Sequence, residues 1–345
     1  MALRIGVLTA GGDAPGLNAA IRAICQLAWR DGHDVIGITN GWAGLAQEYA
    51  GFELRAEQVR DVIGRGGTLL GTARFDLDSP PGGRERVLAS VEEHLDALIA
   101  IGGDGTQRIS HWLAQRDAPV VGVPKTLDND LPGTDYCIGF DSAIALVAES
   151  LDRLHTTAAS HHRVIVVETM GRSTGWVAAL GGLAGGADLI LIPEFPLPMS
   201  DVIDHVKNRR RAGHGYSIVV VAEGVNLETL GGVEANELSR EGVRGVPLAS
   251  RGVGQFVATR IEEKCDVEVR TTVLGHLQRG GSPTAYDRVW ATRVGAGAYH
   301  AVVRSEFGTI PVVRDNRVAL APLSEVATGQ RPVPRELYDL CAEFF

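Results

Sequence analysis

The feature that most constrains the fold is a repeated alternation of short apolar runs with helical patterns. The runs lie at residues 4–9, 33–39, 95–101, 118–124, 163–170, 187–193, 216–224 and 267–275. After the first run, Leu17, Ala20, Ile21, Ile24 and Leu27 recur at helical spacing. Strands that are apolar throughout and alternate with helices indicate parallel sheets covered on both faces, and such sheets bind ligands beyond the carboxyl ends of their strands. The sequence therefore predicts an α/β protein with doubly wound, mostly parallel sheets.

Length and charge limit the organisation and the partners. A chain of 345 residues is long enough for two domains with separate cores. With 33 basic and 42 acidic residues the net charge is −9, which argues against nucleic acid or an anionic membrane as a partner. The most apolar stretch, 176–193, contains Asp188 and four glycines and is unsuited to span a membrane. The start of the chain shows no signal-peptide pattern, and the four cysteines form no C-x-x-C pair, so a cytoplasmic location is expected.

Glycine is concentrated in turns that follow predicted strands. Four such turns lie at residues 11–13, 102–106, 171–175 and 280–282. Glycine allows a close approach of the backbone, and a following helix N-terminus offers N–H groups to an anion. A tight connection between strand and helix would explain any one turn, but several at one end of a sheet favour a phosphate site. None of the three lysines follows a glycine, as a Walker A loop requires, and GGDAPG lacks the spacing of a dinucleotide fingerprint.

Carboxylates and arginines accompany these turns. Asp128 and Asp130 follow the predicted strand at 118–124, and Asp104 ends a comparable strand. In an extended turn the first two would point to the same side, and three carboxylates would suit Mg²⁺ together with a general base for phosphoryl transfer. An Asx turn with N-capping aspartates is the alternative for this segment. The planar fork of arginine matches phosphate oxygens, and four arginines lie at strand ends or beside glycine: Arg163, Arg172, Arg270 and Arg279.

One motif indicates a different chemistry. Residues 171–175 match Gly-x-Ser-x-Gly between a strand and a helix, as in the nucleophile elbow of α/β-hydrolases. His276 comes later in the chain and would complete the order of a catalytic triad. The hydrolase interpretation, however, leaves Asp104, Asp128 and Asp130 without a role.

Taken together, several blocks resemble the bacterial-type phosphofructokinase family. They are GGDAPGLNAAIR, Arg74-Phe75, GGDGT, PKTLDND, GFDSA, Met170-Gly171-Arg172, AEG and VLGHLQRGGSPTAYDR. They follow the family's order from residue 4 to at least residue 300. The resemblance implies two doubly wound domains with the active site in the cleft between them. It further implies phosphoryl transfer to the 1-hydroxyl of fructose 6-phosphate.

The resemblance also implies roles for individual residues. Asp104 would hold Mg²⁺, and Asp128 would be the base, supported by Thr126 and Asp130, while Arg172 would stabilise the transferring group. The donor would lie against Gly12, Arg74, Phe75, Gly103, Gly105, Thr106 and Lys125. Fructose 6-phosphate would lie against Met170, Gly171, Glu223, His276 and Arg279, joined by Arg163 and Arg270 of a neighbouring subunit.

The same resemblance implies the domain bounds and an oligomer. Residues 1–139 with about 278–328 would form the donor domain, and 140–277 with about 329–345 the sugar-phosphate domain. Because the implied site is shared between subunits, a homo-oligomer, typically a tetramer, is expected. The polar segment 226–245 is an insertion relative to compact members of the family, with no assigned role.

Two residues give opposite indications of the phosphate donor. Gly105 stands where pyrophosphate-dependent members have Asp, which favours ATP. Lys125 stands where familiar ATP-dependent members have Gly, which favours pyrophosphate. Gly105 has the greater weight, because a missing carboxylate leaves room for the α-phosphate, whereas a flexible lysine can swing aside. ATP is therefore the expected donor and pyrophosphate the alternative. A non-catalytic sugar-phosphate sensor would be expected to lose Asp104, Asp128 or Arg172, and all three are present.

Overall fold

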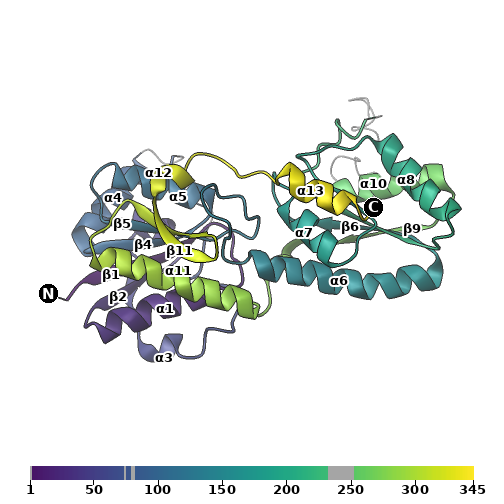
Figure 1. Ribbon diagram of the computed structural model, residues 1–345. Helices are drawn as coiled ribbons and strands as arrows, with labels where there is room; N and C mark the ends of the chain where they lie inside the picture. The colour runs from purple at the N-terminus through teal and green to yellow at the C-terminus, as the bar shows by residue number, and fades with distance from the viewer. Residues whose placement is uncertain (1, 74, 79–81, 232–251) are drawn as a thin grey trace. The chain divides into compact units, whose positions relative to one another are not determined.

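The computed structural model describes residues 2–73, 75–78, 82–231 and 252–345 (Figure 1). The chain divides into two compact units. Unit 1 comprises Met1–Ser142 and Arg279–Arg331, and unit 2 comprises Ala143–Gln278 and Pro332–Phe345. No helix among the described residues is long and apolar enough to cross a membrane.

Unit 1 is built on a seven-stranded sheet in the order β11-β10-β5-β4-β1-β2-β3. Its strands are β1 (Arg4–Ala10), β2 (Asp34–Ile38), β3 (Gly51–Glu53), β4 (Ala97–Gly102), β5 (Val120–Pro124), β10 (Thr309–Arg314) and β11 (Arg317–Pro322). Its helices are α1 (Leu17–Arg30), α2 (Ala43–Ala46), α3 (Ala56–Val59), α4 (Gly83–His94), α5 (Asp104–Ala114), α11 (Ala285–Val303) and α12 (Leu323–Val326). All neighbouring strands are parallel except the pairs β2–β3 and β10–β11.

Both faces of this sheet are covered, as the unbroken apolar strands predicted. Leu8, Leu98 and Ala100 on one face join a core cluster with side chains of α2, α4, α5 and α12. Ile99 and Ile101 alternate with these residues along β4 and are equally buried. Helices α1 and α11 lie side by side and are in contact over much of their lengths (Figure 1). The prediction of a doubly wound, mostly parallel α/β fold is confirmed for this unit.

Unit 2 has a four-stranded parallel sheet in the order β7-β8-β6-β9. Its strands are β6 (Val164–Thr169), β7 (Leu189–Leu191), β8 (Ser217–Ala222) and β9 (Val269–Val273). Its helical segments are α6 (Phe140–His161), α7 (Trp176–Ala184), α8 (Met199–Arg211), α10 (Val253–Cys265), the 3₁₀ turn η2 (Gly275–Arg279) and α13 (Arg335–Ala342). Every predicted strand is present in one of the two sheets. The insertion predicted at 226–245 lies outside the described residues from 232 onward.

A buried carboxylate ties α11 to the start of α6 within unit 1. Asp287 is 0% exposed, and its Oδ1 accepts hydrogen bonds from the Gly139 N–H, at 2.7 Å, and from the Tyr136 hydroxyl. Its Oδ2 accepts from the Ser142 N–H at 2.8 Å and from the Ser142 hydroxyl at 2.5 Å. Burial raises the pKa of the Asp287 carboxyl. These four donors depend on one acceptor group, so its loss would leave several of them unsatisfied.

Replacing Asp287 with alanine is expected to lower the thermal midpoint of unfolding by about 2 to 12 °C. A buried donor without a partner costs about 1 to 3 kcal/mol, and each kcal/mol shifts the midpoint of a domain of this size by about 2 to 4 °C. Differential scanning calorimetry would measure the shift. The control is Asp78→Ala, because the Asp78 side chain is 65% exposed and pairs with Arg84 at the surface. Equal shifts in the two variants would contradict the structural role of Asp287.

Candidate active site

The last residues of three neighbouring strands of unit 1 lie in register. Ala10 of β1 pairs with Gly102 of β4, and Gly102 pairs with Pro124 of β5. Because the three strands are parallel, the segments that follow them leave the same edge of the sheet at the same level. These segments are the turn at 11–16, the start of α5 and the residues 125–130. The structure therefore brings together the donor-side residues that the sequence placed at separate strand ends.

The turn after β1 exposes its backbone to a neighbouring arginine. A Cβ atom at Gly12 would collide with the guanidinium of Arg279, whose Nη1 donates to the Asp13 carbonyl at 2.9 Å. Arg279 Nε is buried and has no hydrogen-bond partner among the described residues. Gly16 ends the turn with a φ of 104° and is the N-cap of α1. The turn thus combines glycines and backbone N–H groups with an adjacent guanidinium, a set of groups suited to an anion. Sequence reasoning assigned Arg279 to the sugar phosphate, and the structure places it beside Gly12.

Lys125 fills the space beneath this turn. Its side chain is 3% exposed, and its Nζ donates to the carbonyls of Ala10, at 3.1 Å, and Gly12. Burial, followed by the charge of Arg279, lowers the pKa of Lys125 to about 8. The expectation of a flexible lysine that can swing aside is wrong, because the ammonium group is enclosed and bound to backbone carbonyls.

The predicted base and its neighbours form a compact loop after β5. Asp128 is 8% exposed, and its N–H donates to Thr126 Oγ1 at 3.2 Å. Asn129 has a φ of 51°, so the segment is not the extended turn that the spacing predicted. Asp130 is 2% exposed, and its Oδ2 accepts from Gln330 Nε2 at 3.2 Å. The loop is fixed further by Arg331, whose side chain donates to the Asn129 carbonyl.

Asp104, the predicted metal ligand, is the first residue of α5. Its side chain is 4% exposed, and Arg108 one turn later binds both carboxylate oxygens, with Nε 2.8 Å from Oδ1. The hydrogen bond to Asp104 raises the pKa of Arg108. The described residues contain no group of three or more His, Cys, Asp or Glu side chains that could hold a metal ion. A single carboxylate fits Mg²⁺, which takes one or two protein carboxylates and fills its other positions with water and substrate phosphates.

The remaining donor-side residues differ in their surroundings. A Cβ atom at Gly105 would meet no atom within 4 Å, whereas one at Gly103 would lie 3.4 Å from the Lys125 carbonyl. Thr106 is 5% exposed and packs on Gly102. Phe75 packs partly buried against the core cluster of unit 1. Arg74 lies outside the described residues.

The predicted sugar-side residues of unit 2 gather at the carboxyl ends of β6 and β8. Thr169 pairs with Ala222, so the Met170-Gly171-Arg172 turn and Glu223 leave the sheet together. Glu223 Oε1 accepts from the N–H groups of Gly171, at 3.3 Å, and Arg172, at 2.9 Å. The carboxylate therefore holds the turn that presents the exposed side chain of Arg172, which has a φ of 56°.

Two residues in this unit were missed by sequence reasoning. Gln278 is 1% exposed, accepts from the Met170 N–H at 3.3 Å and donates to the Gly275 carbonyl at 3.1 Å. It ties η2, which carries the exposed His276, to the Met170 turn. No signal in the sequence marks this glutamine, because a glutamine next to an arginine is ordinary at a surface.

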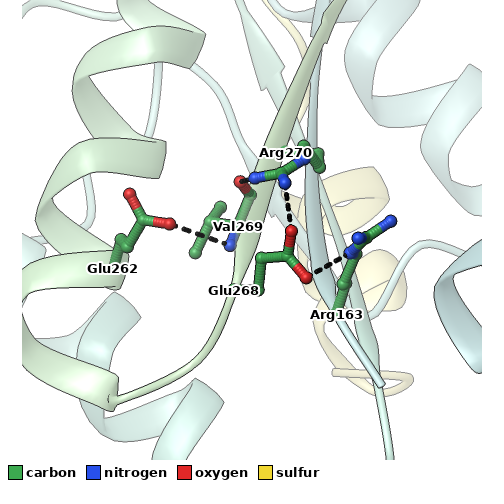
Figure 2. A network of polar contacts seen from close by, with 5 residues as sticks. All are labelled: Arg163, Glu262, Glu268, Val269 and Arg270. Carbon is green, nitrogen blue, oxygen red and sulfur yellow. Dashed lines mark hydrogen bonds and ion pairs between the residues drawn. The ribbon is translucent and has the colours of Figure 1, made fainter. Parts of the chain in front are cut away.

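The second missed residue is Glu268, which joins two predicted phosphate ligands (Figure 2). Its Oε2 accepts from Arg163 Nε at 2.6 Å, and its Oε1 accepts from Arg270. The hydrogen bond from Arg163 is the main cause of a lowered pKa of the Glu268 carboxyl. Figure 2 shows Arg270 of β9 and Arg163, which directly precedes β6, converging on this carboxylate. The pair of arginines predicted to serve another subunit is thus held as one cationic group.

Fold and loops together define a doubly wound α/β enzyme of the phosphotransferase class. The chain belongs to the phosphofructokinase family, whose model, described as Phosphofructokinase, matches residues 4–302. This assignment leaves the Gly-x-Ser-x-Gly match at 171–175 as a turn of that family, and the hydrolase interpretation is set aside.

Curated relatives agree over nearly the whole chain. A protein of Chloroflexus aurantiacus named ATP-dependent 6-phosphofructokinase is 47% identical to this chain, over 98% of this chain and 95% of that protein. In Corynebacterium efficiens the identity is 43%, over 97% of this chain and 96% of that one. Among solved structures, Pichia pastoris phosphofructokinase in the T-state matches with a TM-score of 0.83 and 30% identity, covering all of this chain and 36% of that chain. This chain thus spans about a third of the yeast one. A pyrophosphate-dependent phosphofructokinase from Marinobacter aquaeolei matches at a TM-score of 0.82 and 25% identity, over 99% and 91% of the two chains.

The burial of Lys125 leads to a prediction about pH. Since its pKa in the folded protein, about 8, lies below its ordinary value of 10.5, the unfolded chain binds more protons between these pH values. The stability contributed by Lys125 therefore rises with pH across this window, by about 3 kcal/mol at most at 1.36 kcal/mol per pH unit, and is lost as the pH falls through 8. As the pH rises from 8 to 10.5, we expect the thermal midpoint of wild type to increase relative to that of Lys125→Met.

Thermal unfolding at several pH values would measure this gain. Lys264→Met removes one charge at an exposed position of α10 and is the matched control. Parallel midpoint curves for wild type and Lys125→Met would rule out a buried, protonation-coupled lysine.

Proposed function

We propose that this chain transfers the γ-phosphoryl group of ATP to the 1-hydroxyl of fructose 6-phosphate, giving fructose 1,6-bisphosphate. The observation that carries the proposal is the agreement of relatives named ATP-dependent 6-phosphofructokinase, at 42–47% identity over nearly the whole chain. The match covers 95–100% of the length of these relatives, so their activity concerns the same two units. The arrangement of carboxylates beside glycine turns supports the same reaction, since phosphoryl transfer needs charge neutralisation and a positioned base.

The base in this proposal is Asp128. It follows directly on the Thr126 turn, is mostly buried, and lies in a loop held from both sides by backbone and side-chain hydrogen bonds. A carboxylate held in this way accepts the proton of the 1-hydroxyl as that oxygen attacks the γ-phosphorus. Thr126 and Asp130 position the loop, and Arg172 stabilises the charge of the transferring group.

Donor binding in this proposal depends on the glycine turn after β1. The N–H groups of the turn at Gly12 receive donor phosphate oxygens, Gly103 keeps the backbone at the start of α5 accessible, and Gly105 leaves room for the donor beside it. The proposed divalent cation is Mg²⁺, held at Asp104, and when bound it supplies charge neutralisation between donor phosphates. Arg74, Phe75 and Thr106 complete the proposed donor side.

Sugar binding is proposed for the Met170-Gly171 turn, Glu223 and His276, with Arg279 as a further ligand of the sugar phosphate. The arginines joined by Glu268 are proposed to bind the 6-phosphate in a neighbouring subunit of a homo-oligomer, typically a tetramer. A guanidinium pair held by one carboxylate keeps a net positive charge, as phosphate recognition requires. A cytoplasmic location, and the assignment of unit 1 to the donor and unit 2 to the sugar phosphate, belong to the same proposal.

Pyrophosphate is the second candidate donor, and Lys125 is the residue that favours it. In the structure Lys125 is bound to the carbonyls of Ala10 and Gly12 and is used to support the turn. Gly105 stands beside open space, which a nucleotide can use. Both observations support ATP as the donor.

Replacing Asp128 with asparagine is expected to lower kcat by about 10²- to 10⁴-fold, because the proton acceptor is lost while the shape is kept. A coupled assay of fructose 1,6-bisphosphate formation, run with ATP and separately with pyrophosphate, would measure this. Wild type is expected to turn over with ATP and not with pyrophosphate. Asp152→Asn, at an exposed position of α6, is the matched control. Undiminished kcat in Asp128→Asn would remove Asp128 as the base, and turnover with pyrophosphate alone would reverse the choice of donor.

Gly105 allows a test of donor choice by charge alone. Because a side chain there meets open space, Gly105→Asp and Gly105→Asn are both expected to fold. The added carboxylate would repel the donor, so we expect Gly105→Asp to raise the KM for ATP about 10-fold or more above that of Gly105→Asn, which has the same size. The KM for fructose 6-phosphate is expected to stay within about 2-fold. Equal KM values for ATP in the two variants would show that charge at this position does not determine donor binding.

A further inference from the structure

The carboxylate proposed to hold the metal is already engaged by a cation of the protein. Asp104 is almost fully enclosed, with a side chain that is 4% exposed, and both of its oxygens bind Arg108. The Arg108 side chain is 59% exposed, so the guanidinium reaches the carboxylate from the solvent side. The pair therefore joins a buried anion to a cation that can leave it without disturbing the core.

The helix explains why this pair forms. Residues four apart lie on one face of a helix, one turn above the other, so Arg108 is directly over Asp104 in α5. The planar fork of arginine places two N–H groups opposite two carboxylate oxygens, which a lysine at the same position would not do. The positive end of the helix dipole stabilises the negative charge of Asp104 at the first position. Both carboxylate oxygens are thus occupied in the absence of any ligand.

A divalent cation needs the same oxygens. Mg²⁺ coordinates carboxylate oxygens at about 2.1 Å, and a guanidinium that occupies both of them blocks that approach. We propose that Arg108 stands in for the divalent cation at Asp104 and is displaced from it when the metal-bound donor arrives. This inference rests on the proposed role of Asp104 as the metal ligand.

The substitution of one cation by the other has a consequence for nucleotide binding. Without metal, Arg108 neutralises the charge of Asp104 and so reduces the repulsion between this carboxylate and the donor phosphates. With metal, part of the gain from the new cation is offset by the loss of the Arg108 pair. Arg108 therefore makes nucleotide binding less dependent on metal than it would be with Asp104 alone.

The measurable quantity is the metal enhancement, defined as the Kd of a non-hydrolysable ATP analogue in EDTA divided by its Kd in excess Mg²⁺. Isothermal titration calorimetry gives both values without turnover. In Arg108→Gln we expect this ratio to rise about 3- to 10-fold over wild type, the range for a charge-assisted pair with one buried partner. Most of the rise should come from weaker binding in EDTA. Arg108→Lys, which keeps the charge and loses the fork, is expected to lie between the two.

The matched control is Arg116→Gln. Arg116 lies after the end of α5, and its guanidinium stacks on the Trp112 ring at 3.8 Å. The substitution removes the same charge as Arg108→Gln but far from Asp104. The metal enhancement of Arg116→Gln is therefore expected to equal that of wild type. A ratio in Arg108→Gln that is unchanged or lower than in wild type would overturn the inference. Thermal midpoints of all variants would confirm that each is folded.

Asp104→Asn separates this inference from the proposed function. If its metal enhancement falls well below that of wild type while Arg108→Gln behaves like wild type, Asp104 is the metal ligand and only the stand-in role of Arg108 fails. If Asp104→Asn retains the wild-type ratio, the proposed metal role of Asp104 fails, and the inference about Arg108 fails with it.

Discussion

The register of β1, β4 and β5 is the constraint on which the donor side depends. Ala10, Gly102 and Pro124 lie side by side at the ends of three parallel strands about 4.8 Å apart. Three loops that leave one edge at one level compete for the same space. Two of the loops begin with glycine, which has no side chain to occupy this space. The third loop begins with Lys125, whose side chain reaches the carbonyl of Ala10 at the end of β1. The abundance of glycine in this chain is thus partly a packing requirement of the register.

A second principle is that the charged groups suited to ligands are already paired with groups of the chain. Asp104 is paired with Arg108, and Glu268 joins Arg163 to Arg270. Lys125 is bound to carbonyls, and Glu223 to the N–H groups of the turn that carries Arg172. Groups held in this way are oriented before a ligand arrives, which lowers the conformational entropy lost on binding. An exposed partner such as Arg108 can be exchanged for a ligand, whereas the buried Lys125 cannot.

Much of this could be predicted from the sequence because strand patterns and glycine turns are local signals. The unbroken apolar runs predicted eight of the strands, but β3, β10 and β11 were not anticipated because their patterns are short and mixed. Of these three, β3 and β11 pair antiparallel with their neighbours, and β10 joins the antiparallel β11 to the parallel β5. The partners of site residues were not predictable either. Whether Arg108 meets Asp104 or solvent, and whether Gln278 meets Met170, depends on rotamers and on contacts that are distant in the chain.

Lys125 shows how the structure changes the weight of a sequence marker. By sequence, Lys125 and Gly105 disagree about the donor, because residue identity says nothing about the direction of a side chain. In the structure the two side-chain positions differ in kind: position 105 opens on empty space, while Lys125 is enclosed under the turn at Gly12. Because Lys125 binds the carbonyls of Ala10 and Gly12, it would affect a bound donor only through the turn that it supports. In the proposed function, the free space at Gly105 is then the feature that would act directly on the size and charge of the donor, and it would favour a nucleotide.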